Sequence, residues 1–432
     1  MLRYMTAAFA IAVLIVPVAQ ADRASRTHSS PAQENSVSKW SLISQNAISA
    51  PIPPATTLRP PASSEVLHGL VHAAIYDAVV SVEGEYESLA VSVRAPKRTS
   101  VDAAVAAAAR GVLVARVPTQ AAAVEAAYAA ALLEIPDGDS KTNGIRIGRA
   151  IGGAYVSLRS DDGFDTASPW MQPPTGPGIF EPIPPGSTPV DTRLANIRPL
   201  TFDDPARFRP PGPYLLTSEA YAADVNEVKA LGRATGSTRT DFQTETARFW
   251  TDHPMIQFNR VLRALALAKR LDVVETARMM AMVHVSAADA QAGCWWAKYH
   301  HNLWRPQHAI QKAATDGNPA TTADPTWTHL INGNHPEYPS GHQCITSGET
   351  YALEAYFGTD RIPLDILSNV TGTTRHYDRL RDIRREVTLA RIYGGLHFRK
   401  AMNDSQRMAK ETARYVTRNF FDDRKHHDDD DD

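Results

Sequence analysis

The stretch SEVLHGLVHAAIYDA, residues 64–78, carries the pattern that decides the fold. Its apolar residues recur every three or four positions, so one face of a helix would be apolar. These residues are Leu67, Leu70, Val71, Ala74, Ile75 and Ala78. Ser64 and Glu65 before them suit the first turn of a helix. We therefore predict a helix over this segment.

Alanine-rich runs near 101–116, 119–134 and 139–159 extend this pattern. They combine high helix propensity with small side chains, which suits closely packed bundle helices rather than strands. A second helical series is expected near 218–231, 239–250, 255–270, 272–299, 342–357, 384–393 and 400–419. The predicted fold class is all-α, a helical bundle organised as two packed bundles.

Dense prolines between residues 169 and 213 forbid regular helix and favour an extended crossing loop between the bundles. The predicted organisation is a signal peptide at 1–21, an extended lead-in at 22–62, an N-terminal helical bundle at 63–168, the Pro-rich crossing loop at 169–213, a C-terminal catalytic bundle at 214–421 and an acidic tail at 422–432.

The first residues have the character of an export signal. Arg3 precedes an apolar run from Ala7 to Val18, and Ala19-Gln20-Ala21 has the small-x-small pattern of a cleavage site. The apolar run is shorter than the roughly 20 residues that cross a bilayer, and no later uncharged segment reaches that length. A secreted or periplasmic protein without a membrane span is expected.

Composition argues against nucleic acid as a partner. The 432-residue chain carries a formal net charge of -2 and has a pI of about 6.7, so any anion site must be local. In an oxidising compartment Cys294 and Cys344 would either join in a disulfide or remain two buried thiols. The sequence leaves both alternatives open.

Two fixed cations, Lys298 and Arg305, begin the densest group of functional side chains. They are seven residues apart, so a helix continued to Trp304 would aim both toward one side before Pro306 ends it. Lysine supplies a point charge and arginine a planar fork, which together suit an oxyanion. Taken alone, such a pair is more often a solvated surface stripe.

The segment HPEYPSGH, residues 335–342, precedes a helical pattern and marks a helix N-terminus. Free backbone N–H groups and the helix dipole favour an anion there, Gly341 lets the backbone approach closely, and Ser340 adds a donor. His342 would then transfer a proton at the bound group. The alternative is a capping serine beside an ordinary surface histidine.

The third group is RIYGGLH, residues 391–397. On an ideal helix Arg391 and His397 would diverge by about 120 degrees, so Gly394 and Gly395 must break or tighten the turn for both to reach one ligand. A neutral imidazole at His397 would act as a nucleophile toward phosphorus or as a donor to a metal oxyanion. Without its neighbours, His397 would be a structural histidine.

Three motifs in order, Lys298-x6-Arg305-Pro306, Pro339-Ser340-Gly341-His342 and Arg391-x5-His397, resemble the signature shared by vanadium-dependent haloperoxidases and the type-2 phosphatidic acid phosphatase superfamily. The resemblance implies that His397 binds vanadium or attacks phosphorus, and that His342 is the acid-base residue. The residues implied to hold the equatorial oxygens of vanadate or phosphate are Lys298, Arg305, Ser340, Gly341 and Arg391.

Four neighbouring positions bear on the choice between oxidation and hydrolysis. Trp304 and His335 resemble the halide environment of haloperoxidases, and histidine at 335 is similar to bromide-type rather than chloride-type enzymes. In contrast, Ala390 stands where the superfamily usually has serine. Ala401 stands where phosphatases usually have the aspartate that orients the histidine, and Asp404 is the nearest acid along the chain.

The resemblance therefore implies a vanadium-dependent haloperoxidase with vanadate as cofactor and hydrogen peroxide and a halide as substrates, bromide or iodide being favoured. Lys298 would polarise the bound peroxide. The alternative is an exported acid phosphatase that hydrolyses a small phosphomonoester through a phosphohistidine at His397, oriented by Asp404 or a backbone carbonyl. A non-catalytic helical scaffold is a third reading, which the complete donor set disfavours.

Overall fold

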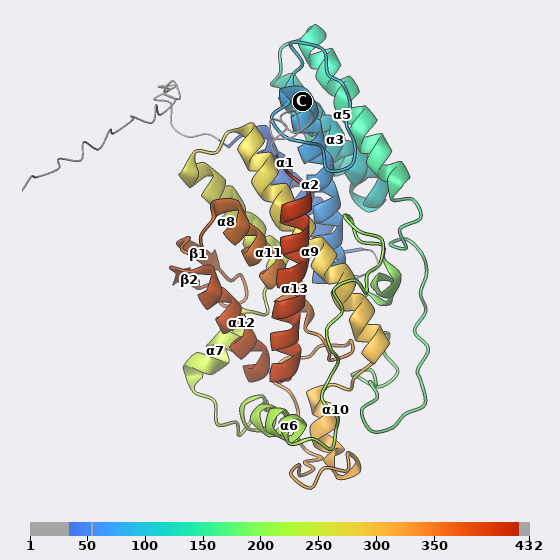
Figure 1. Cartoon of the computed structure of the whole chain (residues 1–432), viewed down its shortest axis with the longest axis vertical. Coiled ribbons are helices and arrows are strands. Elements are labelled where there is room, and N and C mark those ends of the chain that lie inside the picture. Colours follow the sequence, from blue (N-terminus) through green and yellow to red (C-terminus); the bar gives the residue numbers. More distant parts are fainter. Residues whose placement is uncertain (1–33, 53–54, 423–432) are drawn as a thin grey trace, which may run out of the picture. The chain divides into compact units, whose positions relative to one another are not determined.

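The computed structural model describes residues 34–52 and 55–422, so the predicted signal peptide and nearly all of the acidic tail lie outside the described residues. The helices and strands of the described part are shown in Figure 1. The α-helices are α1 (Ser36–Ser49), α2 (Pro61–Glu83), α3 (Val101–Arg116), α4 (Ala121–Leu133), α5 (Asp139–Leu158), α6 (Glu219–Leu231), α7 (Asp241–Phe249), α8 (Pro254–Lys269), α9 (Val273–His301), α10 (Pro306–Gln311), α11 (Gly341–Phe357), α12 (Leu380–Tyr393) and α13 (Arg399–Asn419). The predicted all-α class is confirmed.

Short elements complete the architecture. Strands β1 (Leu364–Leu367) and β2 (Thr374–Tyr377) pair antiparallel, with Leu364 opposite Tyr377, and form a hairpin that helical periodicity does not predict. The 3-10 helices are η1 (Pro118–Gln120), η2 (Thr192–Asn196) and η3 (Ala313–Thr315). The described residues from 34 to 422 lie in one compact unit, and a single core cluster includes residues of both predicted bundles.

Helix α1 corrects the predicted extended lead-in. The Asn35 side chain accepts a hydrogen bond from the Ser38 amide at 3.1 Å and caps the helix, and Val37, Trp40 and Ile48 are buried. The Ser- and Pro-rich composition around α1 hides this helical spacing. The segment is therefore part of the core and not only a surface wrap.

Helices α3 and α5 meet at very close range, as the small side chains predict. A Cβ atom added at Gly148 on α5 would lie 2.2 Å from the Ala104 carbonyl oxygen and 2.7 Å from the Ala107 Cβ on α3. Gly144 makes a similar approach one turn earlier. This backbone contact is possible only because neither helix has bulk at the interface.

Helices α2 and α9 form the centre of the molecule (Figure 1). Helix α9 has 29 residues and is buried on almost all sides from Val274 to Lys298. Among the described helices, only α2 is long and apolar enough to cross a membrane, and 89% of that window is buried in the protein. Helix α2 thus has the character of a core helix.

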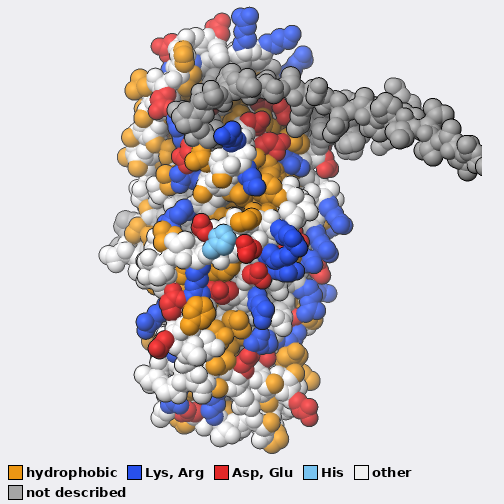
Figure 2. Space-filling view, turned by 90° about the vertical axis from the view of Figure 1, so that its left-hand side faces the viewer, with side chains coloured by type: hydrophobic (Ala, Val, Ile, Leu, Met, Phe, Trp, Pro, Cys, Tyr) orange, Lys and Arg blue, Asp and Glu red, His pale blue; other side chains and the backbone are white. Residues whose placement is uncertain are grey.

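On the face shown in Figure 2, acidic and basic side chains are interspersed.

The Pro-rich crossing loop is extended as expected, apart from η2. The Phe180 amide donates to the Asn302 carbonyl at 2.9 Å, and the Trp304 amide donates to the Gly178 carbonyl at 2.9 Å. Asn302 adopts a left-handed conformation with φ 45°. Helix α9 therefore ends at His301, two residues beyond its predicted end, and does not continue to Trp304 because this bridge turns the chain away.

Candidate active site

Lys298 lies in the last turn of α9 and is fully buried. Its ammonium group donates to the carbonyl oxygens of Pro336 at 2.9 Å, Glu337 at 3.2 Å and Pro339. Burial lowers the pKa of Lys298 to about 8, and the nearby Arg305 charge contributes. All three protons are therefore engaged by backbone. In this structure Lys298 contributes charge to the site and holds the loop before α11, rather than binding an anion directly.

Arg305 lies at the start of α10 and is 2% exposed. Both terminal guanidinium nitrogens are buried without a hydrogen-bond partner. A Cβ atom at Gly333 would lie 2.4 Å from one of them, so Gly333 makes room for the guanidinium. Burying a guanidinium whose donors have no partners destabilises a protein unless an anion accepts hydrogen bonds from them. Arg305 is therefore placed to bind an anion.

Helix α11 begins at Gly341, where the sequence predicts a helix N-terminus, and Ser340 is its capping residue. The Ser340 hydroxyl caps the helix by accepting from the Gln343 amide at 3.4 Å, and the Ser340 amide donates to the Ser405 hydroxyl at 2.7 Å. A Cβ atom at Gly341 would lie 2.5 Å from a ring carbon of Trp295, so only glycine fits there. His342 follows, and its Nε2 is buried without a partner.

The end of α12 turns as the two glycines predict. Gly395 has φ 72° and the Leu396 amide donates to the Arg391 carbonyl at 3.0 Å, which closes the helix in a Schellman-type turn. The Arg391 Nη1 donates to the Trp250 carbonyl at 2.9 Å, while its Nε is buried without a partner. The turn brings His397 back toward Arg391, whose charge lowers the pKa of that histidine.

Glu337 is the acid that orients His397, and the sequence did not predict this role. The Nδ1 of His397 lies 3.0 Å from Glu337 Oε1, and the Phe398 amide donates to the same oxygen at 2.9 Å. Asp404 instead accepts from the Tyr338 hydroxyl at 2.7 Å and pairs with Lys400 and Arg407. The prediction of Asp404 as the orienting acid is wrong, because Asp404 is engaged elsewhere.

One oxygen of Glu337 accepts two hydrogen bonds, and this fixes the tautomer of His397. Burial raises the pKa of Glu337 to about 8. In its acid form the proton belongs on Oε2, which has no partner, because Oε1 already accepts from the Phe398 amide. In either charge state the His397 Nδ1–H therefore donates to Oε1. The lone pair of Nε2 remains available as a ligand or nucleophile, and burial with the nearby Arg305 charge lowers the pKa of His397 well below its usual value.

Part of the predicted site lines one cavity of about 340 Å³, whereas Lys298, Arg305 and Ser340 are not among its lining residues. Gly341, His342, Arg391, His397 and His335 line it. The rings of His335 and His397 are 6.3 Å apart between centroids, so His335 lies at the site as predicted. The predicted second member of the halide environment, Trp304, is fully buried in a separate apolar cluster and is not among the lining residues.

The free donors around His397 suit an oxyanion such as vanadate or phosphate. They are the terminal nitrogens of Arg305 and Nε of Arg391, and Nε2 of His342 is also buried without a partner. Burial, together with the charges of Arg305, Lys298 and Arg391, lowers the pKa of His397. Buried cationic donors that lack partners, around a histidine lone pair, match a tetrahedral or five-coordinate anion.

The two cysteines lie in the wall behind the site. Cys294 on α9 and Cys344 on α11 are buried free thiols that contact each other. Of the two alternatives open from the sequence, this structure has the thiol pair.

Comparison with known proteins agrees with this geometry. Residues 278–423 match the family model of the VCPO second helical-bundle domain. The vanadium chloroperoxidase of Curvularia inaequalis is 24% identical, over 37% of this chain and 36% of that protein, so the match spans about a third of the relative's length.

Solved structures share the fold over much more of the chain. A bacterial vanadium-dependent iodoperoxidase matches with a TM-score of 0.73 at 20% identity, covering 89% of this chain and 97% of that one. A holo-type bacterial vanadium-dependent chloroperoxidase matches with a TM-score of 0.69 at 17% identity, covering 90% and 97%. At these identities the structural likeness establishes the fold.

The matched residues contain most of α9 and all of α10–α13. This region carries the oxyanion cage, which consists of Lys298, Arg305, Ser340, Gly341, Arg391 and His397. Residues 278–423 are therefore similar to a domain of vanadium chloroperoxidase, and the chain as a whole shares the fold of bacterial vanadium-dependent haloperoxidases.

Proposed function

We propose that this chain is a vanadate-dependent haloperoxidase that uses hydrogen peroxide to oxidise bromide or iodide in preference to chloride. The observation that carries the proposal is the His397 lone pair, presented by Glu337 into a cage of unpartnered cationic donors. Vanadate held there would supply Lewis-acid activation of peroxide without a change of metal oxidation state.

Each residue of the cage has a defined task in this proposal. His397 Nε2 would hold the vanadium, and the guanidinium groups of Arg305 and Arg391 would bind its oxygens with the backbone of Gly341, since the Ser340 amide already donates to Ser405. Lys298 adds positive charge through space, because its protons are engaged by carbonyl oxygens. The original expectation that Lys298 polarises peroxide by direct contact would require it to leave those carbonyls.

His342 is placed to accept a proton. Burial, with a contribution from the Arg391 charge, lowers the pKa of His342 well below its usual value, so its imidazole is neutral at neutral pH. Its Nε2 is unpartnered, and the residue lines the cavity. A neutral imidazole there would take the proton from incoming hydrogen peroxide and later return it to the departing oxygen.

His335 supports the halide preference. It lies between Trp295, at 5.3 Å between ring centroids, and His397, at 6.3 Å, and lines the same cavity. An imidazole there would meet a halide as it approaches the reacting oxygen. His335→Phe should therefore change the ratio of bromide to chloride oxidation more than it changes vanadate affinity.

The phosphatase alternative has one observation in its favour. Glu337 supplies the orienting carboxylate that Ala401 cannot, so His397 is also oriented as a phosphorus nucleophile. The experiment that separates the two functions is a pair of assays on the same preparation. With orthovanadate, peroxide, bromide and an organic acceptor, we expect bromination; without vanadate, we expect no release of phosphate from a chromogenic phosphomonoester. The reverse pattern would support the phosphatase instead of the haloperoxidase. The absence of both activities would support a non-catalytic scaffold.

A further inference from the structure

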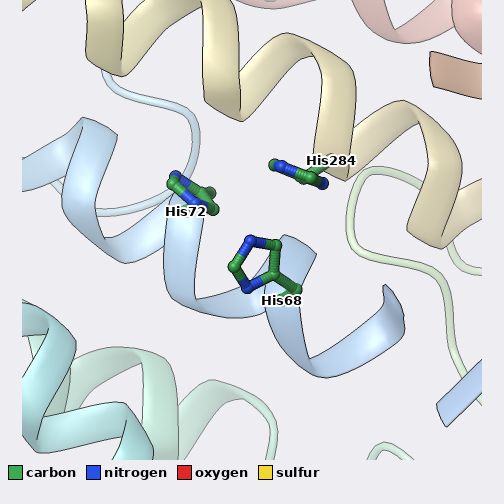
Figure 3. Close-up of side chains that lie close together, drawn as sticks. All are labelled: His68, His72 and His284. Carbon is green, nitrogen blue, oxygen red and sulfur yellow. The ribbon is translucent and has the colours of Figure 1, made fainter. Parts of the chain in front are cut away.

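A second cluster of titratable side chains lies in the helical core, apart from the oxyanion cage. His68 and His72 on α2 and His284 on α9 bring their rings together (Figure 3). The centroid of His68 is 4.7 Å from His72 and 4.4 Å from His284, and the latter two are 4.9 Å apart. His284 is fourteen residues before Lys298 on the same helix, about 21 Å along its axis.

Two buried carboxylates join these histidines. Glu65 precedes His68 and His72 on one face of α2, and Glu349 approaches from α11. Ligand atoms of the three histidines lie within 4.8 Å of one another, and so do those of Glu65, His284 and Glu349. All five side chains are 0% exposed, so water cannot balance their polarity.

Hydrogen bonds fix the tautomer of His72. The Ser41 hydroxyl donates its single proton to the Asn259 side-chain oxygen at 2.5 Å, so it accepts from His72 Nε2 at 2.9 Å. Asn259 is held in that orientation because its amide nitrogen donates to Gln45 at 2.9 Å. His72 Nδ1 therefore carries a lone pair, and it has no hydrogen-bond partner.

A similar contact orients His284. Its Nδ1 lies 3.0 Å from Glu65 Oε1, and its Nε2 is buried without a partner. A histidine whose far nitrogen faces a carboxylate is the usual arrangement for a metal ligand, because the carboxylate fixes the ring and raises its basicity. Neither ring nitrogen of His68, which lies between the other two rings, has a hydrogen bond of normal geometry.

Without an ion, this cluster leaves many buried polar atoms unsatisfied. The unpartnered atoms are both nitrogens of His68, Nδ1 of His72, Nε2 of His284, Oε2 of Glu65 and both carboxylate oxygens of Glu349. Buried polar groups in proteins are nearly always paired or bound to metal, so this concentration calls for a ligand.

We propose that His68, His72 and His284 bind one divalent transition-metal ion of the zinc type. Three imidazole nitrogens suit such an ion, and two adjacent carboxylates balance its charge. Glu65 acts as a positioning residue through His284, and Glu349 supplies the second carboxylate. The site is closed to solvent, so the ion is structural and joins α2, α9 and α11, of which α9 and α11 also carry cage residues.

The backbone is shaped for this junction. A Cβ atom at Gly69, next to His68, would lie 2.7 Å from the Ala288 Cβ and 2.8 Å from the His284 carbonyl oxygen. On the other side of α9, a Cβ at Gly348 would lie 2.9 Å from the Ala287 backbone. Helix α9 therefore lies at very close range to both α2 and α11 at the level of the cluster.

The test is zinc content and cobalt absorption of the full chain. Protein from zinc-supplemented medium is dialysed against chelator, and zinc is measured by mass spectrometry; cobalt-substituted protein is examined in the visible range. We expect one zinc per chain and the intense visible absorption of low-coordinate cobalt. His68→Gln and His72→Gln should lose both signals, and Glu65→Gln should weaken zinc affinity about 10–100-fold.

Controls separate this site from the other histidines. His376→Gln, at a solvent-exposed histidine on β2, and His397→Ala, in the oxyanion cage, should keep the zinc, as should the double substitution of the tail residues His426 and His427 by alanine. Wild-type protein without zinc and without the cobalt spectrum would overturn the proposal. So would folded His68→Gln protein that retains both. If the histidine variants fail to fold, the wild-type cobalt spectrum and the Glu65→Gln affinity decide.

Discussion

At the residue scale, Glu337 orients the imidazole ring of His397. Its Oε1 accepts from both His397 Nδ1 and the Phe398 amide, which leaves the Nε2 lone pair free. Two acids, Glu337 and Asp404, were available from the sequence, and only the first reaches the histidine. This contact spans sixty residues of sequence. Side-chain identity alone could not reveal it, because it depends on how the loop before α11 packs against the α12–α13 turn.

Glu337→Gln should weaken orthovanadate binding about 10–100-fold. The glutamine oxygen can still accept both hydrogen bonds, but the carboxylate charge is lost; that charge favours a basic His397 and is present mainly above the Glu337 pKa of about 8. Isothermal titration at pH 9 measures this change. Asp404→Asn is the matched control, since Asp404 contacts Tyr338 rather than His397, and its affinity should stay near that of wild type. A larger loss in Asp404→Asn than in Glu337→Gln would contradict the assignment.

The charge of Lys298 should make anion binding sensitive to pH. Its pKa is lowered to about 8, so the ammonium form dominates below that pH and is lost as pH rises through it. Lys298→Met has no charge at any pH. We expect wild type to bind orthovanadate at least about tenfold, or about 1.4 kcal/mol, more tightly than Lys298→Met at pH 6.5.

That advantage should disappear above about pH 8. The comparison with Lys298→Met cancels the ionisation of vanadate itself. Lys298→Arg, which remains charged, should keep the advantage at high pH if the protein folds. An affinity ratio that is constant with pH would show that Lys298 contributes no titrating charge to the site.

At the element scale, the start of α11 depends on a contact between glycine and tryptophan. Gly341→Ala would place a methyl group 2.5 Å from the Trp295 ring, so the ring or the helix must shift. We expect a loss of about 1–3 kcal/mol in the free energy of unfolding, together with weaker vanadate binding. Gly153→Ala, in the open on α5, should instead stabilise by about 0.5–1 kcal/mol. Urea denaturation measures both; equal stability of the two variants would argue against this packing.

The predicted elements succeed where periodicity is strong and fail where it is weak. Helices such as α2 and α11 follow directly from apolar spacing. Helix α1 lies within a Ser- and Pro-rich segment, and β1 and β2 have only four residues each, too few for a clear pattern. The end of α9 depends on pairing between Leu303 and Ile179, a long-range contact that no local signal records.

At the scale of the whole molecule, the two halves should unfold together. The described residues from 34 to 422 lie in one compact unit, and α2 of the first half packs against α9 of the second. Gly148→Val, at the α3–α5 contact, should destabilise the protein by about 1–3 kcal/mol, because the added side chain meets backbone of α3. Thermal loss of helical circular dichroism and of vanadate binding should shift together.

Gly153→Val on the same helix is the matched control, since no atom lies within 4 Å of its added Cβ. It should leave both transitions nearly unchanged. Gly148→Val could instead lower the temperature at which helical circular dichroism is first lost while vanadate still binds at that temperature. The two halves would then be separate folding units. The sequence predicts two bundles but not their shared core. The apolar patterns of α2 and α9 are each compatible with two separate bundles and with one common core.

The central claim is that His397 holds an oxyanion in a cage of buried cations. Calorimetric titration of orthovanadate into the wild-type chain and His397→Ala at pH 7 tests it most directly. We predict one site per chain in wild type and at least about a hundredfold weaker binding, near 2.7 kcal/mol, in the variant. Wild-type protein that binds no vanadate, or a folded His397→Ala protein that binds it equally well, would contradict the account.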